Sequence, residues 1–165
     1  MPDRQEIHNL SALRQHFTSC FKETYADRLT SEELCGLIAG LNTPDLGGLL
    51  PGKDERIVTR GNHGDVSGCA IWALRAGTAY IWGFYVRKAE QRRGVGRSLL
   101  MGVLAVLPPQ SRVKVQVLKD SPSAVAFYRH FGFEIEGEAL HELAPGRHDV
   151  ALHMVGMASD LRQVT

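Results

Sequence analysis

Apolar residues near the beginning of the chain recur every three or four positions, which places them on one face of a helix. The first such run extends from Leu10 to Tyr25. The second begins at Thr30-Ser31-Glu32-Glu33, which has the form of a capping box, and stops before Pro44. This pattern predicts two amphipathic helices and then a loop over residues 42–53, which hold three glycines and two prolines.

Apolar and polar positions alternate after the loop, and this period of two is typical of β-strands. Residues 56–60, 67–74 and 78–86 show it, separated by short segments that contain glycine. They predict an antiparallel meander of three strands. Both faces of the third strand carry large apolar side chains, Tyr80 among them, so we expect a central strand that is buried on both faces.

The helical period returns at residues 91–107, where Pro108-Pro109 ends it, and alternation resumes at residues 113–117. A strand, a helix and a strand in this order form a right-handed crossover. The strands at Tyr80 and Val113 are therefore expected to be parallel, and the sheet to be mixed.

The last part of the chain predicts one more helix and a hairpin. The helix follows Ser121-Pro122, with Ser121 as its cap and Gly132 at its end. Residues 133–138 and 147–157 alternate well enough to pair as two strands. The pattern as a whole predicts an α+β fold.

Charge and length exclude several classes of protein. The 165 residues contain 19 Lys and Arg against 18 Asp and Glu, which gives a formal net charge of +1. One domain over residues 1–165 is the expected organisation. Nucleic acid is not an expected partner, because the sequence has no long basic run.

Neither a metal site nor a membrane segment is expected. The three cysteines are widely spaced and form no Cys-X-X-Cys pair, and His148 and His153 fall on opposite faces of a predicted strand. The longest apolar run, residues 99–107, is too short to span a membrane. The first thirty residues lack the apolar stretch of a signal peptide, so a cytoplasmic location is the expectation.

One short segment has the composition of an anion site: Gln91-Arg92-Arg93-Gly94-Val95-Gly96-Arg97, between a predicted central strand and a predicted helix. Glycines let the backbone approach a ligand, and the first amides of a helix are donors at the positive end of its dipole. A phosphate or pyrophosphate would fit there, although a lone Gly-X-Gly is equally compatible with a turn of purely structural role. The segment is neither a P-loop nor a dinucleotide motif, since Leu99 replaces the third glycine.

A second motif further along the chain supports a more specific interpretation of this segment. Val86 followed by Gln91-X-X-Gly94-X-Gly96 resembles the acetyl-CoA motif of GNAT-type N-acetyltransferases, and residues 121–133 are similar to the second motif of that family. The resemblance covers residues 67–133 at the level of motifs. It implies the GNAT acyl-CoA N-acyltransferase fold, a mixed and mostly antiparallel sheet of six to seven strands flanked by about four helices, with a splayed parallel pair at the cofactor site.

The resemblance also implies acetyl-CoA as cosubstrate and no metal. Backbone amides of residues 92–97 would hold its pyrophosphate, and the main chain of Phe84 and Val86 would bind its pantetheine arm. The full set of implied cofactor-binding residues is Phe84, Val86, Gln91, Arg92, Arg93, Gly94, Val95, Gly96, Arg97, Ser121 and Ala124. Ser121 departs from the family, which usually has Asn there.

The same resemblance assigns one catalytic residue. Acyl transfer to an amine leaves a thiolate that needs a proton, and Tyr128 matches the tyrosine that supplies it in the family; filling the core is the alternative role of this ring. The general base stays open, because Tyr80 stands where many relatives have Glu. Contributors to a water relay could be Glu134, Glu136, Asp149, His63, His130 and His148.

These features favour an N-acetyltransferase that moves an acetyl group from acetyl-CoA to a primary amine of a small molecule or peptide by direct attack. The alternative is a non-catalytic acyl-CoA-binding regulatory module of the same fold, and a homodimer is left open. We place the acceptor pocket between residues 42–53 and residues 139–148, because both segments lack a hydrophobic period and contain turn residues.

Overall fold

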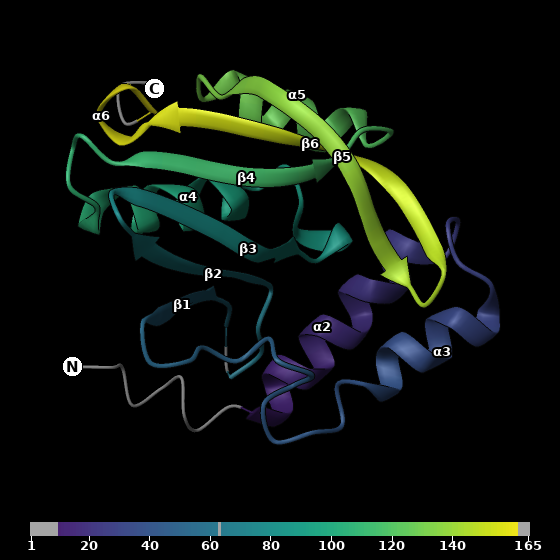
Figure 1. Ribbon diagram of the computed structural model, residues 1–165. Coiled ribbons are helices and arrows are strands. Elements are labelled where there is room, and N and C mark those ends of the chain that lie inside the picture. The colour runs from purple at the N-terminus through teal and green to yellow at the C-terminus, as the bar shows by residue number, and fades with distance from the viewer. Residues whose placement is uncertain (1–9, 63, 162–165) are drawn as a thin grey trace. The chain divides into compact units, whose positions relative to one another are not determined.

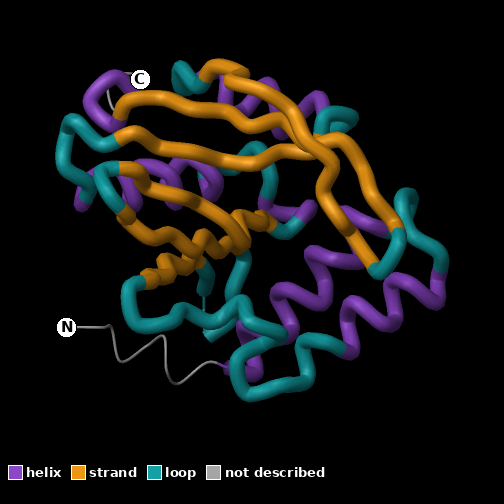
Figure 2. The backbone as a smooth tube through the Cα atoms, in the orientation of Figure 1, coloured by secondary structure: helices purple, strands orange, loops and turns teal. Residues whose placement is uncertain are grey.

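The computed structural model describes residues 10–62 and 64–161. Figure 1 labels the helices and strands, and Figure 2 colours them by type. In chain order they are α2 (Leu10–Tyr25), α3 (Ser31–Ala39), β1 (Glu55–Arg60), β2 (Gly68–Arg75), β3 (Thr78–Val86), the 3-10 turn η1 (Lys88–Glu90), α4 (Val95–Val106), β4 (Arg112–Leu118), α5 (Pro122–His130), β5 (Glu134–Ala144), β6 (Arg147–Met157) and α6 (Ala158–Leu161).

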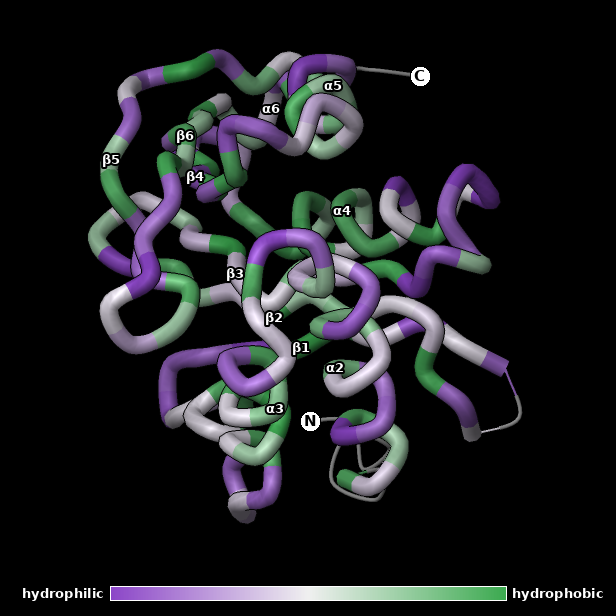
Figure 3. Tube along the Cα trace, turned by 90° about the vertical axis from the view of Figure 1, so that its right-hand side faces the viewer, coloured by the Kyte–Doolittle hydropathy of each residue, from purple (hydrophilic) through white to green (hydrophobic). Residues whose placement is uncertain are grey.

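The sheet is mixed, as the sequence predicts. Its six described strands run in the order β1-β2-β3-β4-β6-β5. β3 and β4 are parallel, whereas β4 pairs with β6 and β6 with β5 in antiparallel fashion. The helix α4 lies between β3 and β4 along the chain, so the predicted crossover is confirmed, and Figure 3 shows α4 as mostly hydrophobic.

The closing hairpin is longer than predicted. β5 extends to Ala144, which is paired with Arg147 across the two-residue turn Pro145-Gly146. Most of residues 139–148 are therefore strand and not the loop that we expected. Their hydrophobic period is interrupted because the ladder shifts register between Glu142 and Ala144.

The chain forms two compact units. Among the described residues, unit 1 comprises 10–62, 64–71 and 83–100, and unit 2 comprises 72–82 and 101–161. In unit 1, α2 and α3 lie side by side (Figure 1). The predicted capping box of α3 is present, with Thr30 and Glu33 exchanging hydrogen bonds.

The core of unit 1 forms around α2. The buried face of this helix presents Phe17 and Phe21 to Tyr85 of β3, with ring centroids 6.1 and 5.6 Å away. His16 belongs to the same face and is only 1% exposed. Its Nε2 lies 3.2 Å from the carbonyl oxygen of Tyr85, so the buried ring is hydrogen-bonded.

Unit 2 is built on the alternation of β4. Val113, Val115 and Val117 are buried, and α5 packs against this strand. The short helix α6, which the sequence analysis did not predict, docks on β6 through the fully buried Leu161. The expectation that Tyr80 of β3 is buried is wrong, since this residue is 41% exposed. Its neighbours Ala79 and Ile81 lie on the buried face of the strand, and because side chains alternate along a strand, Tyr80 lies on the opposite face.

The buried His16 predicts a pH dependence of stability. Burial lowers the pKa of His16 from 6.5 to about 4. The unfolded chain therefore binds a proton at this position before the folded chain does, and stability falls as the pH decreases from about 6.5 towards 4. We expect a loss on the order of 3 kcal/mol in the free energy of unfolding at pH 4, measured by urea denaturation across this range.

The variant His16→Gln is the matched control, because Gln keeps a donor for the Tyr85 carbonyl but does not titrate. Its free energy of unfolding should change much less between pH 6.5 and 4. An equally steep pH dependence in both proteins would assign the effect to other groups.

Candidate functional site

The strands β3 and β4 part at the position that the sequence assigns to the cofactor. Their register runs from Thr78 opposite Arg112 to Ile81 opposite Val115. β3 then continues to Val86. Parallel strands that separate in this way offer backbone groups to an extended ligand, much as to an added strand. The register thus confirms the predicted splayed pair.

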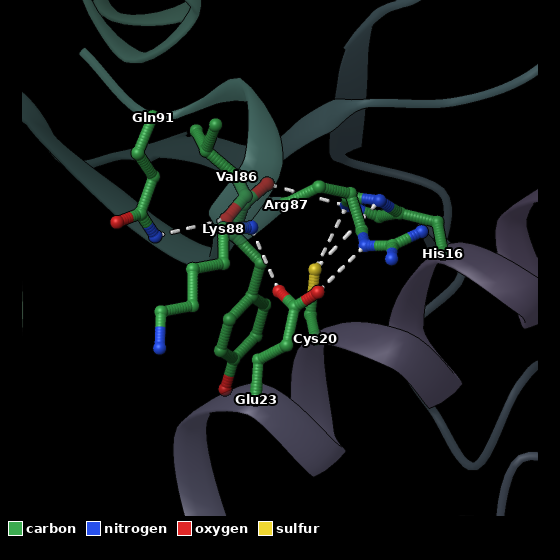
Figure 4. A network of polar contacts seen from close by, with 8 residues as sticks. His16, Cys20, Glu23, Val86, Arg87, Lys88 and Gln91 are labelled. Atoms are coloured by element: carbon green, nitrogen blue, oxygen red, sulfur yellow. Dashed lines mark hydrogen bonds and ion pairs between the residues drawn. The ribbon is translucent and has the colours of Figure 1, made fainter.

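The carbonyl group of Val86 points away from β2. The N–H group of Arg87 donates to the carbonyl of Ser67, just before β2, at 2.9 Å. Backbone groups alternate in direction along an extended chain, so the Val86 carbonyl points to the other side. It accepts a hydrogen bond from Gln91 Nε2 at 3.1 Å (Figure 4). A carbonyl has two lone pairs, and Val86 can therefore accept a second donor.

After η1, the chain makes a turn with two left-handed residues before α4 begins. Arg92 has φ 65° and Gly94 has φ 82°, and the positive φ at Arg92 costs on the order of 1 kcal/mol. A Cβ atom at Gly94 would meet nothing within 4 Å, so the turn is open there. The first helical bond joins the N–H of Ser98 to the carbonyl of Gly94 at 2.9 Å, and by helix geometry the amides of residues 95–97 precede it.

The start of α4 is seated closely against β1 and β2. A Cβ atom at Gly68 would stand 2.6 Å from Val95 Cγ1 and 2.9 Å from Leu99 Cδ1, so glycine is needed for this approach. Arg60 donates to Ser98 Oγ at 2.7 Å and to the Ser98 carbonyl at 3.3 Å. Sequence reasoning missed the contacts of Arg60 with Ser98, since these residues are 38 positions apart.

Side chains of α2 hold the segment that connects β3 to the turn (Figure 4). Glu23 accepts a hydrogen bond from Arg87 Nε at 3.0 Å and another from the backbone N–H of Lys88 at 2.8 Å. The Tyr25 and Tyr85 hydroxyl groups are 2.7 Å apart. α2 therefore fixes the backbone on both sides of Val86.

The arginines of the turn lie mostly in water. Arg92, Arg93 and Arg97 are exposed, and Arg93 forms an ion pair with Glu90 at 3.8 Å. Exposed charges of one sign attract an anionic ligand over a distance but hold it weakly. Tight binding of an anion at this turn therefore depends on the backbone amides.

Tyr128 lies on α5 in unit 2 and is buried. Its ring packs on Phe127 and Phe133, with centroids 5.1 and 5.3 Å away. Burial raises the pKa of the Tyr128 hydroxyl well above its usual value of 10, so the phenol stays protonated across the neutral range. Ala124 is one turn earlier on the same helix and is half-buried.

The predicted capping role of Ser121 is wrong. Ser121 is the N-cap of α5, but its side chain makes no capping hydrogen bond. Its backbone has φ −106° and ψ 78°, outside the extended conformation from which a cap side chain reaches the first amides. Pro122 at the first position of the helix is confirmed.

The acidic residues of β5 bind cations of β4 and the segment after it. Glu136 contacts Arg112 at 3.0 Å and Lys114 at 3.2 Å, and hydrogen bonds from these two cations lower its pKa. Glu138 contacts Lys119 at 3.0 Å. A carboxylate stabilised in this way is a poor base, so Glu136 is a weak candidate for that role.

Other candidates for the base are spread over the surface. His130 is exposed, His148 lies 3.4 Å from Glu142, and Asp149 accepts the N–H of Val150 at 2.9 Å. His63 lies outside the described residues. Within residues 10–62 and 64–161, no group of three His, Cys, Asp or Glu side chains could hold a metal ion. No helix in that part of the chain is long and apolar enough to cross a membrane.

The predicted site residues thus fall into two groups. Unit 1 contains Phe84, Val86 and all of residues 91–97, and their elements follow one another from strand to turn to helix. Unit 2 contains Ser121, Ala124 and Tyr128, all at or on α5. The residues that sequence reasoning missed, Glu23 among them, support the first group from outside it.

Several known structures share the fold of this chain. PaiA N-acetyltransferase from Thermoplasma acidophilum, solved in complex with coenzyme A, is similar with a TM-score of 0.74 and 16% identity over 92% of this chain and 94% of that one. The ribosomal-protein-alanine N-acetyltransferase of Escherichia coli has a TM-score of 0.65 and 17% identity over 91% and 88% of the two chains. A chimera of the spermidine N-acetyltransferase of Vibrio cholerae and hSSAT has a TM-score of 0.65 and 17% identity over 91% and 92% of the two chains.

At such identities, these likenesses establish the fold and not the substrate. No curated protein sequence matches the chain. A family-level description does match it: that of the acetyltransferase (GNAT) family, over residues 10–133. Both motifs that carry the resemblance fall within the matched residues, and the second ends at the last of them. Because the match spans most of the 165 residues, the chain belongs to the acetyltransferase (GNAT) family.

Proposed function

We propose that this protein transfers an acetyl group from acetyl-CoA to a primary amine of a small molecule or peptide. The observation that carries the proposal is the continuous path in unit 1 from the separated end of β3, through an open turn with two left-handed residues, to the first amides of α4. Extended backbone suits the amides of a pantetheine arm, and a helix N-terminus suits a pyrophosphate.

The residues present fit this cosubstrate. Val86 and Phe84 would bind the pantetheine arm through the main chain, and the backbone of residues 92–97 would hold the pyrophosphate, with Gln91, Arg92, Arg93 and Arg97 adding side-chain contacts. Ser121 and Ala124 would complete the binding residues. When bound, acetyl-CoA supplies an acetyl group activated as a thioester.

Tyr128 serves as the general acid in this proposal. Its raised pKa keeps the hydroxyl protonated across the neutral range, so the group holds a proton that it can donate to the departing sulfur. Residues 78–86 contain no carboxylate, and we propose that the proton of the amine leaves through ordered water. Neutral amine is the reactive form, so the rate should rise with pH until the amine is deprotonated.

The test of the proposed activity is release of free thiol from acetyl-CoA across a panel of amines that contains a polyamine, a monoamine and peptides with free N-termini. Catalysis predicts amine-dependent thiol release, and the preferred amine identifies the class of acceptor. Binding of acetyl-CoA without amine-dependent release would support the regulatory module instead, which the missing strand carboxylate favours.

The variant Gly96→Glu tests the pyrophosphate site. A carboxylate in the first turn of α4 interacts favourably with the helix dipole, so this interaction should not destabilise the folded protein. The same charge should repel the pyrophosphate and weaken coenzyme A binding by roughly 100-fold or more, measured by calorimetry. The control is Gly96→Ala, which fits a helix better than Gly and adds no charge. Undiminished affinity in Gly96→Glu would place the pyrophosphate elsewhere.

The variant Tyr128→Phe tests the general acid. It should lower kcat by about 100-fold or less and leave the dissociation constant of coenzyme A unchanged, because only the hydroxyl is lost. Phe133→Leu alters the packing of the same ring and keeps the hydroxyl, so it controls for packing. If Tyr128→Phe turned over at the wild-type rate across the pH range, its ring would have a packing role alone.

A further inference from the structure

The segment Tyr85–Lys88 is where the strand part of the proposed cofactor site passes into its turn. Val86 belongs to β3, whereas Lys88 begins η1, the 3-10 turn that leads to Gln91. Any change in the backbone direction at Lys88 would rotate the following turn relative to Val86. The relative position of these two parts matters because a single extended ligand would have to contact both.

One carboxylate bonds to this junction at two points. Glu23 Oε2 accepts the backbone N–H of Lys88 at 2.8 Å, and Glu23 Oε1 accepts Arg87 Nε at 3.0 Å (Figure 4). The Glu23 side chain is 25% exposed and that of Arg87 34%, so both groups are partly withdrawn from water. Hydrogen bonds to a charged acceptor are roughly twice as strong as neutral ones.

Glu23 is itself held in place by the rest of α2. Phe21, two residues earlier, packs on Tyr85, and the Tyr25 hydroxyl, two residues later, lies 2.7 Å from that of Tyr85. The carboxylate therefore extends from a helix that is already anchored to the same strand. A partner fixed in this way can determine the backbone geometry of a segment that it contacts.

We propose that Glu23 is a positioning residue for the cofactor turn: it fixes the Lys88 amide and thereby sets the turn of residues 91–94 at the distance from Val86 that the pyrophosphate and the pantetheine arm require. The inference rests on the proposed function. Glu23 acts through the backbone bond to Lys88, and the ion pair with Arg87 orients its carboxylate. It does not touch the cosubstrate.

Three variants separate these contributions. Glu23→Ala removes both bonds, Glu23→Gln keeps an acceptor for the Lys88 amide but loses the ion pair, and Arg87→Ala loses the ion pair alone. We expect coenzyme A to bind roughly 10-fold more weakly to Glu23→Ala, and within about 3-fold of wild type to the other two, measured by calorimetry. The Lys88 amide should exchange its hydrogen faster in Glu23→Ala alone.

Glu136→Ala is the matched control for a general loss of stability. It also removes a carboxylate that accepts a hydrogen bond from an arginine at 3.0 Å, but that pair, with Arg112, lies in unit 2 and includes none of the proposed cofactor residues. Its affinity for coenzyme A should equal that of wild type. If it weakened binding as much as Glu23→Ala did, the effect would be one of stability and the positioning role would be wrong.

The wild-type titration separates the two proposals. If wild type does not bind coenzyme A, the proposed function fails, and the positioning role fails with it. If wild type binds and Glu23→Ala binds equally well, only the positioning role is overturned. If Glu23→Ala does not fold, the other two variants still test the proposal. Equal losses of coenzyme A affinity in Glu23→Gln and Arg87→Ala, with the Lys88 amide still protected from hydrogen exchange, would also contradict the role of the backbone bond.

Discussion

The separation of β3 from β4 after Ile81 is the constraint on which the site depends. Parallel strands joined by a helix need a crossover, and α4 supplies it: β3 ends at Val86 and the helix begins at Val95. The separated strand end and the helix N-terminus are thus neighbours along the chain. An extended backbone and a set of helix amides, two different binding surfaces, arise from one topological requirement.

The remaining elements of unit 1 keep these surfaces rigid. α2 packs aromatic rings on Tyr85 and bonds to the backbone at Tyr85 and Lys88, whereas Gly68 and Arg60 seat the first turn of α4. The turn between them includes Arg92 at φ 65°, a conformation that persists only where its surroundings determine it. This strain is consistent with a turn that is held open for a ligand.

The two units differ in the electrostatics of the predicted site residues. In unit 1 the arginines are exposed and weakly paired, which suits attraction of an anion followed by binding on backbone amides. In unit 2, burial raises the pKa of Tyr128, so its hydroxyl group is uncharged in the neutral range. Glu136 of β5 is compensated by Lys114 and Arg112, whose hydrogen bonds lower the pKa of its carboxyl group and leave it little basicity.

The sequence by itself determined the order of the elements other than η1 and α6, the crossover, the capping box of Thr30 and the turn that leads into α4, because each follows from a periodicity or motif within a few residues. It did not determine that Ser121 fails to cap its helix, that β5 continues to Ala144, or that Tyr80 is exposed. These depend on local backbone angles and on strand neighbours. The contacts of Glu23 with Lys88 and of Gly68 with Val95 join residues that no local pattern relates, and only tertiary packing brings such residues within bonding distance.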